Sequence, residues 1–102
     1  MVITTAGKKQ DAQKIAKTLV EKRLAGCVQI IGPITSTYWW KDNIEIDEEW
    51  ICFIKSKKSV YDTLEEAIKS VHPYETPEII AIPITEGSKQ YFHWLDNELS
   101  TK

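Results

Sequence analysis

The stretch HPYETPEII, from His72 to Ile80, places an imidazole, a phenol and a carboxylate within nine positions that also hold two prolines. Imidazole and carboxylate groups are suitable ligands for copper, zinc or nickel, so His72 and Glu75 are candidate ligands of a divalent cation. Pro73 excludes the interior of a regular helix here, so the His-x-x-Glu spacing does not by itself put both side chains on one helical face. The pattern therefore indicates a cation site that needs further ligands.

The further ligands would have to come from elsewhere in the chain, where Cys27 and His93 are available. Cys27 could also act as a thiolate nucleophile with His72 as its base, which requires hydrogen-bond contact and a partly exposed thiol. The sequence offers no third orienting group and no oxyanion loop, and Cys27 is followed by apolar residues. We therefore expect a binding protein and not an enzyme.

Each residue of the stretch also has a purely structural interpretation. His72 could bond the end of a preceding helix, and Tyr74 could pack at an interface. Glu75 could pair with Lys55 or Lys57. Metal binding and packing both remain open at this point.

The chain has 102 residues, of which 42% are hydrophobic and 27% are charged, as in an ordinary single globular domain. We expect one domain over residues 1–102. No apolar run approaches the roughly 20 residues that cross a membrane, and no secretory signal pattern is visible at the start, so the sequence predicts a cytoplasmic protein without a membrane partner. The net charge is −2 and lysines alternate with acids, which argues against nucleic acid as a partner.

The elements that would position these residues follow from periodicity. Apolar residues at steps of three and four predict a helix from Asp11 to Leu24, with Val20 on its inner face, and a second helix that ends near His72. Ser59 followed by Asp62 resembles a capping box at the start of this second helix. The remaining segments are a cautious first strand (2–5), extended runs at 26–40 and 44–55, a strand at 78–85 and a final helix at 88–99.

Three local features refine this outline. Pro33 cannot donate to a β-ladder, so its strand should lie at an edge or contain a bulge. Residues 41–43 should form the turn of a long hairpin, with Asn43 able to adopt a left-handed conformation. In the last helix, the residues expected to face inward are Tyr91, Trp94, Leu95 and Leu99.

The order β-α-β-β-α-β with a final helix predicts an α+β, ferredoxin-like fold, in which an antiparallel sheet carries two helices on one face. Tyr38, Trp39, Trp40 and Trp50 lie on the hairpin, and adjacent tryptophans point to opposite faces of a strand. One helical layer cannot cover both faces, and monomers seldom leave such a patch in water. We expect self-association through the open sheet face and the hairpin, unless a terminal segment folds back over the sheet.

Several motifs occur together: RLAGCVQI, YWWKDNIEIDEE, KSKKSVYDTLEEAIKSVHPYETPEII and FHWL. Together they resemble the CutA family, named for divalent cation tolerance, over nearly the whole chain. The chain departs from the family pattern in a short first strand and in Gly26, Gln29 and Asn43.

The resemblance implies a tight homotrimer, similar in architecture to the PII signalling proteins, that responds to copper or other divalent metal ions. It implies that clefts between subunits gather Cys27, Lys55, His72, Tyr74 and Glu75, with Trp39 and Trp40 nearby. Of these, we assign His72, Glu75 and Cys27 as the metal ligands, and we expect no metal to be needed for folding. The alternative functions are binding of a small ligand in the same clefts and a trimeric scaffold or signalling protein that regulates or anchors a partner protein.

Overall fold

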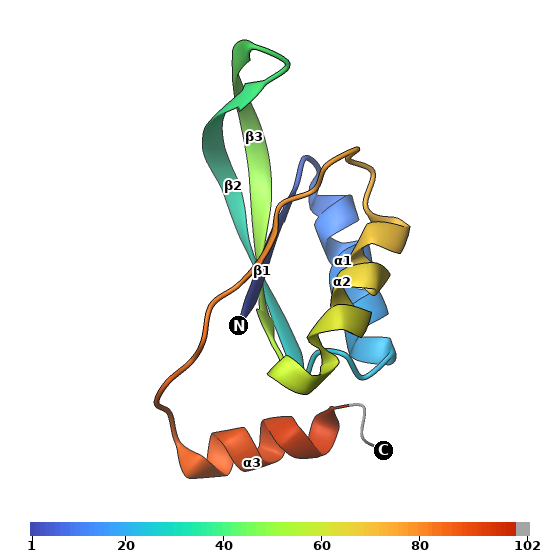
Figure 1. The fold of residues 1–102 in the computed structure, drawn as a ribbon, viewed down its shortest axis with the longest axis vertical. Coiled ribbons are helices and arrows are strands. Elements are labelled where there is room, and N and C mark those ends of the chain that lie inside the picture. The colour runs from blue at the N-terminus through green and yellow to red at the C-terminus, as the bar shows by residue number, and fades with distance from the viewer. Residues whose placement is uncertain (100–102) are drawn as a thin grey trace.

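The computed structural model describes residues 1–99 of the chain. The elements occur in the predicted order, with one additional 3-10 helix before the second α-helix (Figure 1). They are β1 (Val2–Ala6), α1 (Lys9–Glu21), β2 (Cys27–Trp40), β3 (Asn43–Lys55), the 3-10 helix η1 (Lys58–Val60), α2 (Tyr61–Val71), β4 (Ile79–Ala81) and α3 (Lys89–Glu98).

The four strands form one antiparallel sheet in the order β2-β3-β1-β4, which confirms the ferredoxin-like fold. Helices α1 and α2 lie together on one side of the sheet, as Figure 1 shows. The hairpin of β2 and β3 extends past the rest of the sheet at one end, and α3 lies at the other end (Figure 1). The sheet thus separates a helical layer from a face that the helices leave open.

The core lies between the two helices and the sheet. The inward stripes predicted from periodicity are confirmed for both helices, and the fully buried members are Ala12, Ile15, Leu19, Leu64 and Ile68. Val20 was expected on the inner face, but its side chain is exposed. Leu19 lies at the centre of the buried stripe, and Val20, about 100° further round the helix, lies outside it.

Strand β1 lies in the interior of the sheet although it is short. All five of its residues pair with β3, and Val2 to Thr4 also pair with β4 on the other side. Every residue of β1 is buried. The first strand therefore holds the two halves of the sheet together, which its cautious assignment from sequence did not indicate.

Pro33 lies on the edge strand β2 and at a bulge, so both conditions expected from the sequence are met. The register with β3 shifts between Ile31 and Ile34, around Gly32 and Pro33. The Trp50 ring packs directly on Gly32, where an added Cβ would overlap Trp50 Cδ1. Only glycine fits between this bulge and the indole ring.

The hairpin turn is confirmed, but its left-handed residues differ from the expected one. Lys41 and Asp42 have φ values of 49° and 66°, whereas Asn43 already begins β3. Two successive positive φ values are the signature of the tight turn that matches the twist of a hairpin. The Asn43 amide Nδ2 supports the turn by donating to the Lys41 carbonyl at 3.2 Å.

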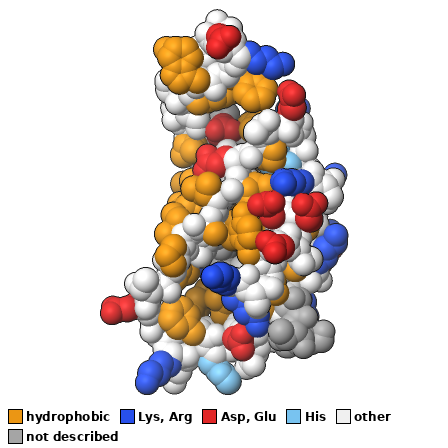
Figure 2. Space-filling view, viewed as in Figure 1, with side chains coloured by type: hydrophobic (Ala, Val, Ile, Leu, Met, Phe, Trp, Pro, Cys, Tyr) orange, Lys and Arg blue, Asp and Glu red, His pale blue; other side chains and the backbone are white. Residues whose placement is uncertain are grey.

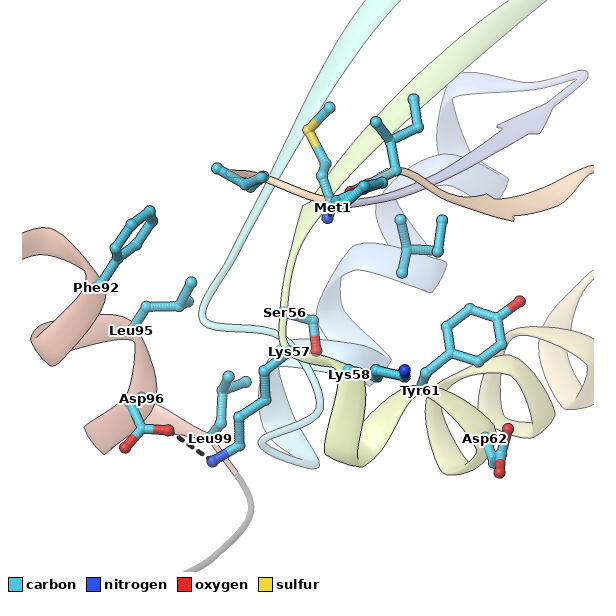
Figure 3. Close-up of a pocket in the computed structure, with 15 residues that line it drawn as sticks. Met1, Ser56, Lys57, Lys58, Tyr61, Asp62, Phe92, Leu95, Asp96 and Leu99 are labelled. Carbon is cyan, nitrogen blue, oxygen red and sulfur yellow. Dashed lines mark hydrogen bonds and ion pairs between the residues drawn. The ribbon is translucent and has the colours of Figure 1, made fainter. Parts of the chain in front are cut away.

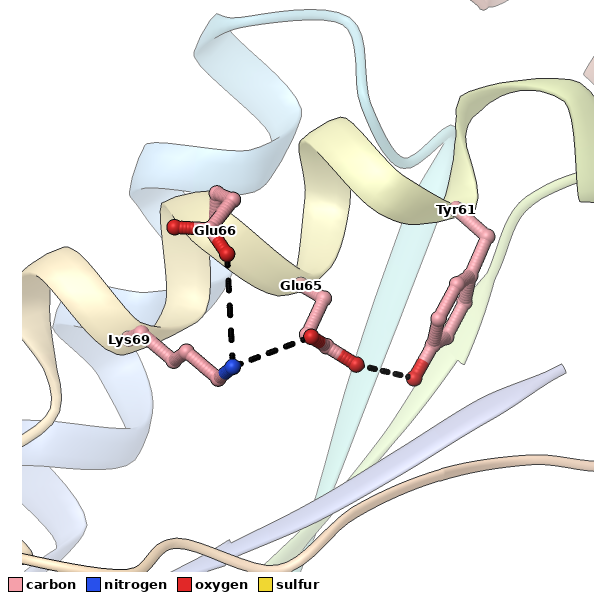
Figure 4. A network of polar contacts seen from close by, with 4 residues as sticks. All are labelled: Tyr61, Glu65, Glu66 and Lys69. Atoms are coloured by element: carbon pink, nitrogen blue, oxygen red, sulfur yellow. Dashed lines mark hydrogen bonds and ion pairs between the residues drawn. The ribbon is translucent and has the colours of Figure 1, made fainter.

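The capping box expected at Ser59 is wrong. Ser59 lies inside η1, and the N-cap of α2 is Val60, which makes no side-chain cap bond. A network of polar side chains instead runs along the surface of α2 (Figure 4): the Tyr61 hydroxyl donates to Glu65 at 2.8 Å, and Lys69 donates to the other Glu65 oxygen at 3.0 Å. Both hydrogen bonds hold the pKa of Glu65 below its usual value, and the bond from Tyr61 has the larger effect.

The structure differs from the prediction for the last strand and for the last helix. Regular pairing of the last strand stops at Ala81, followed by a further backbone pair in which Met1 and Ile82 exchange hydrogen bonds of 2.6 and 2.7 Å. In α3, Leu95 is buried as expected and Leu99 is buried just beyond the helix, but Tyr91 and Trp94 are exposed.

Cys52 gives the fold a distinct sensitivity to alkaline pH. Burial raises the pKa of its thiol from 9.0 to about 11. Between these values the unfolded chain loses a proton that the folded chain keeps, so the free energy of unfolding falls as pH rises, and the contribution is complete below pH 9. We expect a Cys52→Ala variant to lose less stability than the original chain when urea denaturation is repeated between pH 9 and pH 11. Equal losses in the two chains would contradict this prediction.

Candidate functional site

His72 is the central residue of the HPYETPEII loop and is held by both ring nitrogens. Helix α2 ends at Val71, as predicted, and His72 adopts an extended conformation before Pro73. The Tyr74 backbone N–H donates to His72 Nδ1 at 3.1 Å, and Nε2 lies 2.7 Å from the Thr5 carbonyl oxygen. Because Nδ1 accepts a bond, the ring proton is on Nε2, which donates to Thr5. The imidazole is neutral in this arrangement and joins the loop to β1.

Tyr74 continues the connection toward the hairpin. Its hydroxyl donates to Glu49 Oε2 at 2.7 Å, and its ring lies 4.7 Å from the imidazole of His72. The pKa of Tyr74 is raised well above its usual value. Burial is the larger cause, and the hydrogen bond to Glu49 is the second. Glu49 is only 7% exposed, so this hydroxyl partners a carboxylate that is largely removed from water.

Glu75 lies at the exposed side of the loop. Its carboxylate is 4.0 Å from Lys41 Nζ at the hairpin turn, and both side chains are largely exposed. Lys41 Nζ also lies 5.5 Å above the Trp40 ring, in a cation–π position. The structure thus brings Glu75 to the tip of the hairpin, whereas the packing interpretation expected Lys55 or Lys57 beside it.

Cys27 and Lys55 lie at the opposite end of the sheet. They pair with each other at the start of β2, and Lys55 Nζ donates to Gln29 Oε1 at 3.0 Å. His72 contacts Thr5, which pairs with Ile51, four residues along β3 from Lys55. This offset corresponds to about 13 Å along the strand. Within one chain, Cys27 and Lys55 therefore do not meet His72, Tyr74 and Glu75.

The other predicted site residues lie at the two ends of the molecule. Trp40 lies near the loop, because Lys41 bridges its ring and Glu75, and Trp39 is 71% exposed beside it on the hairpin. His93 lies on α3 at the far end of the molecule. Among residues 1–99, no group of three His, Cys, Asp or Glu side chains is placed to hold a metal ion. Thiol, imidazole and carboxylate groups are suitable ligands for a divalent cation, but the fold of a single chain does not bring them together.

Sequence reasoning missed two residues of the loop network, Glu49 and Thr5. Glu49 lies in the acidic run of β3 with Glu45, Asp47 and Glu48, a pattern typical of a solvated hairpin edge, yet Glu49 is buried. Asp47 is also bonded, accepting from the Tyr38 hydroxyl at 2.6 Å, and this bond raises the pKa of Tyr38 to about 12. Thr5 takes part through its backbone, so no side-chain pattern could have indicated it.

A comparison with known protein families shows to which family the chain belongs. The family description for CutA1 divalent ion tolerance proteins matches residues 1–98. The chain belongs to the CutA1 family. It is 41% identical over 95 residues to the divalent-cation tolerance protein CutA of Thermus thermophilus, a match that covers 93% of this chain and 92% of the relative.

The chain is also 49% identical over 84 residues to the mouse protein CutA, covering 82% of this chain but only 48% of the mouse protein. It therefore spans about half the length of that CutA relative, as it does for the rice chloroplastic CutA 1, of which 55% is covered.

Solved CutA1 structures have the same fold. The Thermus thermophilus structure superposes with a TM-score of 0.94 at 39% identity, over 97% of this chain and 96% of the other. The rice CutA1 structure gives 0.95 at 36% identity, over 99% and 93%. In an Archaeoglobus fulgidus structure with a TM-score of 0.93 at 37% identity, over 97% and 96%, the CutA protein is described as periplasmic.

Across residues 1–99, none of the helices has the length and apolar character needed to cross a membrane. CutA relatives are described as chloroplastic in rice and periplasmic in Archaeoglobus fulgidus. The family is therefore found in more than one compartment, and the cytoplasmic location of this chain stays a prediction.

Proposed function

We propose that this CutA1 chain acts as a homotrimer with PII-like architecture that binds copper or another divalent cation in clefts between its subunits, as part of the response to metal ions. The observation that carries the proposal is the separation of the donors. Cys27 lies at one end of the sheet, and His72 and Glu75 lie at the other, so only a neighbouring copy could bring them together.

Self-association is supported by the apolar surface that a single chain leaves in water. Figure 2 shows hydrophobic side chains along the projecting hairpin and down the same face of the molecule. Trp39 and Ile46 are 71% and 66% exposed, and Ile44, opposite Trp39, is exposed as well. Isolated monomers seldom expose such a continuous patch, so burial against further copies would stabilise the assembly.

The three proposed ligands differ in how readily they could bind a cation. Glu75 is exposed and has only a long ion pair, and the Cys27 thiol is partly exposed. His72 could offer Nδ1 only if the Tyr74 N–H gave up its bond. Cys27 and Glu75 are therefore the ligands that need no rearrangement, and His72 completes the proposed site.

The proposal includes neither a structural metal nor a catalytic role. The core between α1, α2 and the sheet consists of apolar side chains. His72, the base that a Cys27 nucleophile would need, lies at the other end of the sheet. A small ligand in place of the cation is the alternative occupant that we propose for the same residues.

The test is a calorimetric titration of the full chain with Cu²⁺ and with Zn²⁺. We expect saturable binding that Cys27→Ser and Glu75→Gln each weaken by about tenfold or more, in line with the loss of groups that support a metal. Cys52→Ala is the matched control, since it removes the buried thiol, and it should leave the affinity unchanged. No saturable binding, or equal affinity in all variants, would overturn the cation proposal.

A second candidate is a trimeric scaffold that anchors or regulates a partner protein, with metal binding incidental. It is favoured by the exposed pair Tyr91 and Trp94 on α3, whose rings lie 5.6 Å apart, away from the hairpin. A pull-down with the original chain and with Trp94→Ala tests it. A partner captured only by the original chain supports the scaffold, and capture of nothing by either counts against it.

A further inference from the structure

The sheet changes from three strands to a two-stranded ribbon at Glu49 and Ile34, which we call the hairpin root. Strand β1 pairs with β3 only as far as Ala6, opposite Trp50, so Glu49 is the first residue of β3 beyond β1. Its partner Ile34 is the first paired residue of β2 after the bulge. Among residues 1–99, the part of β3 before Trp50 pairs with β2 alone. A two-stranded ribbon is marginally stable by itself and a bulge bends its strand, so the direction of the hairpin depends on contacts at the root.

Tyr74 lies where the pairing of β1 with β3 stops. Gly7 and Glu49 would be the next pair of that ladder. The Tyr74 hydroxyl donates to Glu49 Oε2 at 2.7 Å, and a Cβ added at Gly7 would lie 2.9 Å from the same hydroxyl oxygen. The hydroxyl therefore fits between the end of β1 and the hairpin root. Glu49 is buried, and hydrogen bonds to a carboxylate are stronger than those between neutral groups.

The main chain at Tyr74 is attached to the body of the molecule through His72. The Tyr74 N–H donates to His72 Nδ1, and His72 Nε2 donates to the Thr5 carbonyl of β1. His72 is buried, and its ring centroid lies 4.7 Å from that of Tyr74. A continuous path of contacts thus runs from β1 through His72 and Tyr74 to Glu49. This path joins the hairpin root to the body where the sheet ladder does not.

We infer that Tyr74 is a positioning residue of the hairpin. Through its bond to Glu49 it fixes the direction in which the hairpin leaves the body, and so the fit of the hairpin to neighbouring copies. The role rests on the homotrimer proposed above and needs no cation. A hairpin already held in its docked direction loses less conformational freedom when copies associate, so the bond strengthens the assembly. The ion pair of Glu75 with Lys41 also joins the loop to the hairpin, but both side chains are largely exposed, so it contributes little.

Sedimentation over a dilution series tests the effect on assembly. Tyr74→Phe keeps the ring and removes the hydroxyl, so the concentration at which half of the trimer dissociates should rise about tenfold or more, as expected for the loss of a bond to a charged group. Ser70→Ala is the control, because it removes a hydroxyl that donates to the Ala67 carbonyl at 2.7 Å within α2. It should dissociate as the original chain does. An unchanged midpoint in Tyr74→Phe would overturn the inference.

Two replacements of Glu49 show what Tyr74 needs at the hairpin root. Glu49→Gln keeps an oxygen that accepts from the Tyr74 hydroxyl, so its midpoint should stay within about threefold of the original. Glu49→Leu is similar in size and has no acceptor, so it should behave as Tyr74→Phe does. Combining Glu49→Leu with Tyr74→Phe should add little, because both remove the same bond. The inference is overturned if Gln weakens the trimer as much as Leu, or if the two changes add fully.

The direction of the hairpin is measured by residual dipolar couplings of backbone amides, in single chains obtained with the Trp39→Ser and Ile46→Ser replacements. In that background, the couplings of residues 35–48 should fit the same molecular alignment as those of α1 and α2. Adding Tyr74→Phe should reduce the couplings of the hairpin and leave those of the helices unchanged. Hairpin couplings that do not respond to Tyr74→Phe would contradict the positioning role, even if the trimer is weakened.

Tyr61→Phe is the matched control for the couplings. It also removes a tyrosine hydroxyl that donates to a glutamate, Glu65, at 2.8 Å. Tyr61 lies beside the hollow next to α3, at the other end of the molecule from the hairpin (Figure 3). Its replacement should leave the hairpin couplings unchanged, and an equal loss in both variants would overturn the inference.

The couplings and the sedimentation also separate this role from the homotrimer. An original chain that is monomeric at every concentration would overturn the homotrimer, and with it the effect of Tyr74 on assembly. The couplings would still decide whether Tyr74 directs the hairpin, because they are measured in single chains.

Discussion

Replacing His72 by alanine is expected to lower the free energy of unfolding by about 3 kcal/mol, because it removes one buried and one partly buried hydrogen bond and leaves their partners without a substitute. The Thr5 carbonyl would lose its donor, and the Tyr74 N–H would lose its acceptor. Thr5 is itself buried, so water cannot readily replace the imidazole. Urea denaturation of the two chains measures the difference.

Two conservative variants separate this structural role from metal binding. Gln can reproduce the Nε2 donor toward Thr5, and Asn can reproduce the Nδ1 acceptor toward Tyr74, so each should recover part of the lost stability. Cation titration of the stable variant then shows whether His72 is also a ligand, because an amide is a poor substitute for imidazole at copper. A loss below about 1 kcal/mol in His72→Ala would contradict the structural role.

The second large effect is expected at the hairpin. A Trp39→Ser and Ile46→Ser double variant should sediment as a single chain, while the original chain sediments as a trimer. Both residues are mostly exposed within one chain, so their replacement costs the isolated fold little. In an interface, Trp39 alone would bury some 200 Å² of largely apolar surface, which corresponds to about 5 kcal/mol per subunit.

Val20→Ser is the matched control for the hairpin variant, since Val20 is an exposed apolar residue on α1, away from the hairpin. It should leave the sedimenting mass unchanged. An original chain that sediments as a monomer would overturn the trimer, and a double variant that remains trimeric would show that the hairpin does not hold the assembly together.

Most of the fold could be predicted because short sequence patterns indicated the same helices, strands and turns that the structure contains. The three-and-four spacing of buried residues in α1 and α2, the turn at residues 41–43 and Pro33 on an edge strand are each readable over a few positions. The errors in the last helix arose where a distant segment decides burial. Trp94 was expected inward, but α3 turns Leu95 toward the body, and nothing within the helix itself specifies what it packs against.

The candidate site was less predictable for the same reason. Its residue types indicated a cation site, yet the partners of His72 and Tyr74 are Thr5 and Glu49, which lie 67 and 25 positions away in sequence. Glu49 sits in a run of acids and carries no local sign of burial. Such contacts follow from the topology of the sheet, which brings β1 and β3 beside the loop that ends α2.

The interior position of β1 has a consequence for how the chain folds. Strand β1 precedes both of its partners: Val2 pairs with Ile54 on one side and with Ala81 on the other. Pairings this distant in sequence require large loops to close, and proteins dominated by them fold slowly. During synthesis, β1 leaves the ribosome before both of its partners, and its pairing cannot be completed until β4 has emerged, so the sheet should form only late in synthesis.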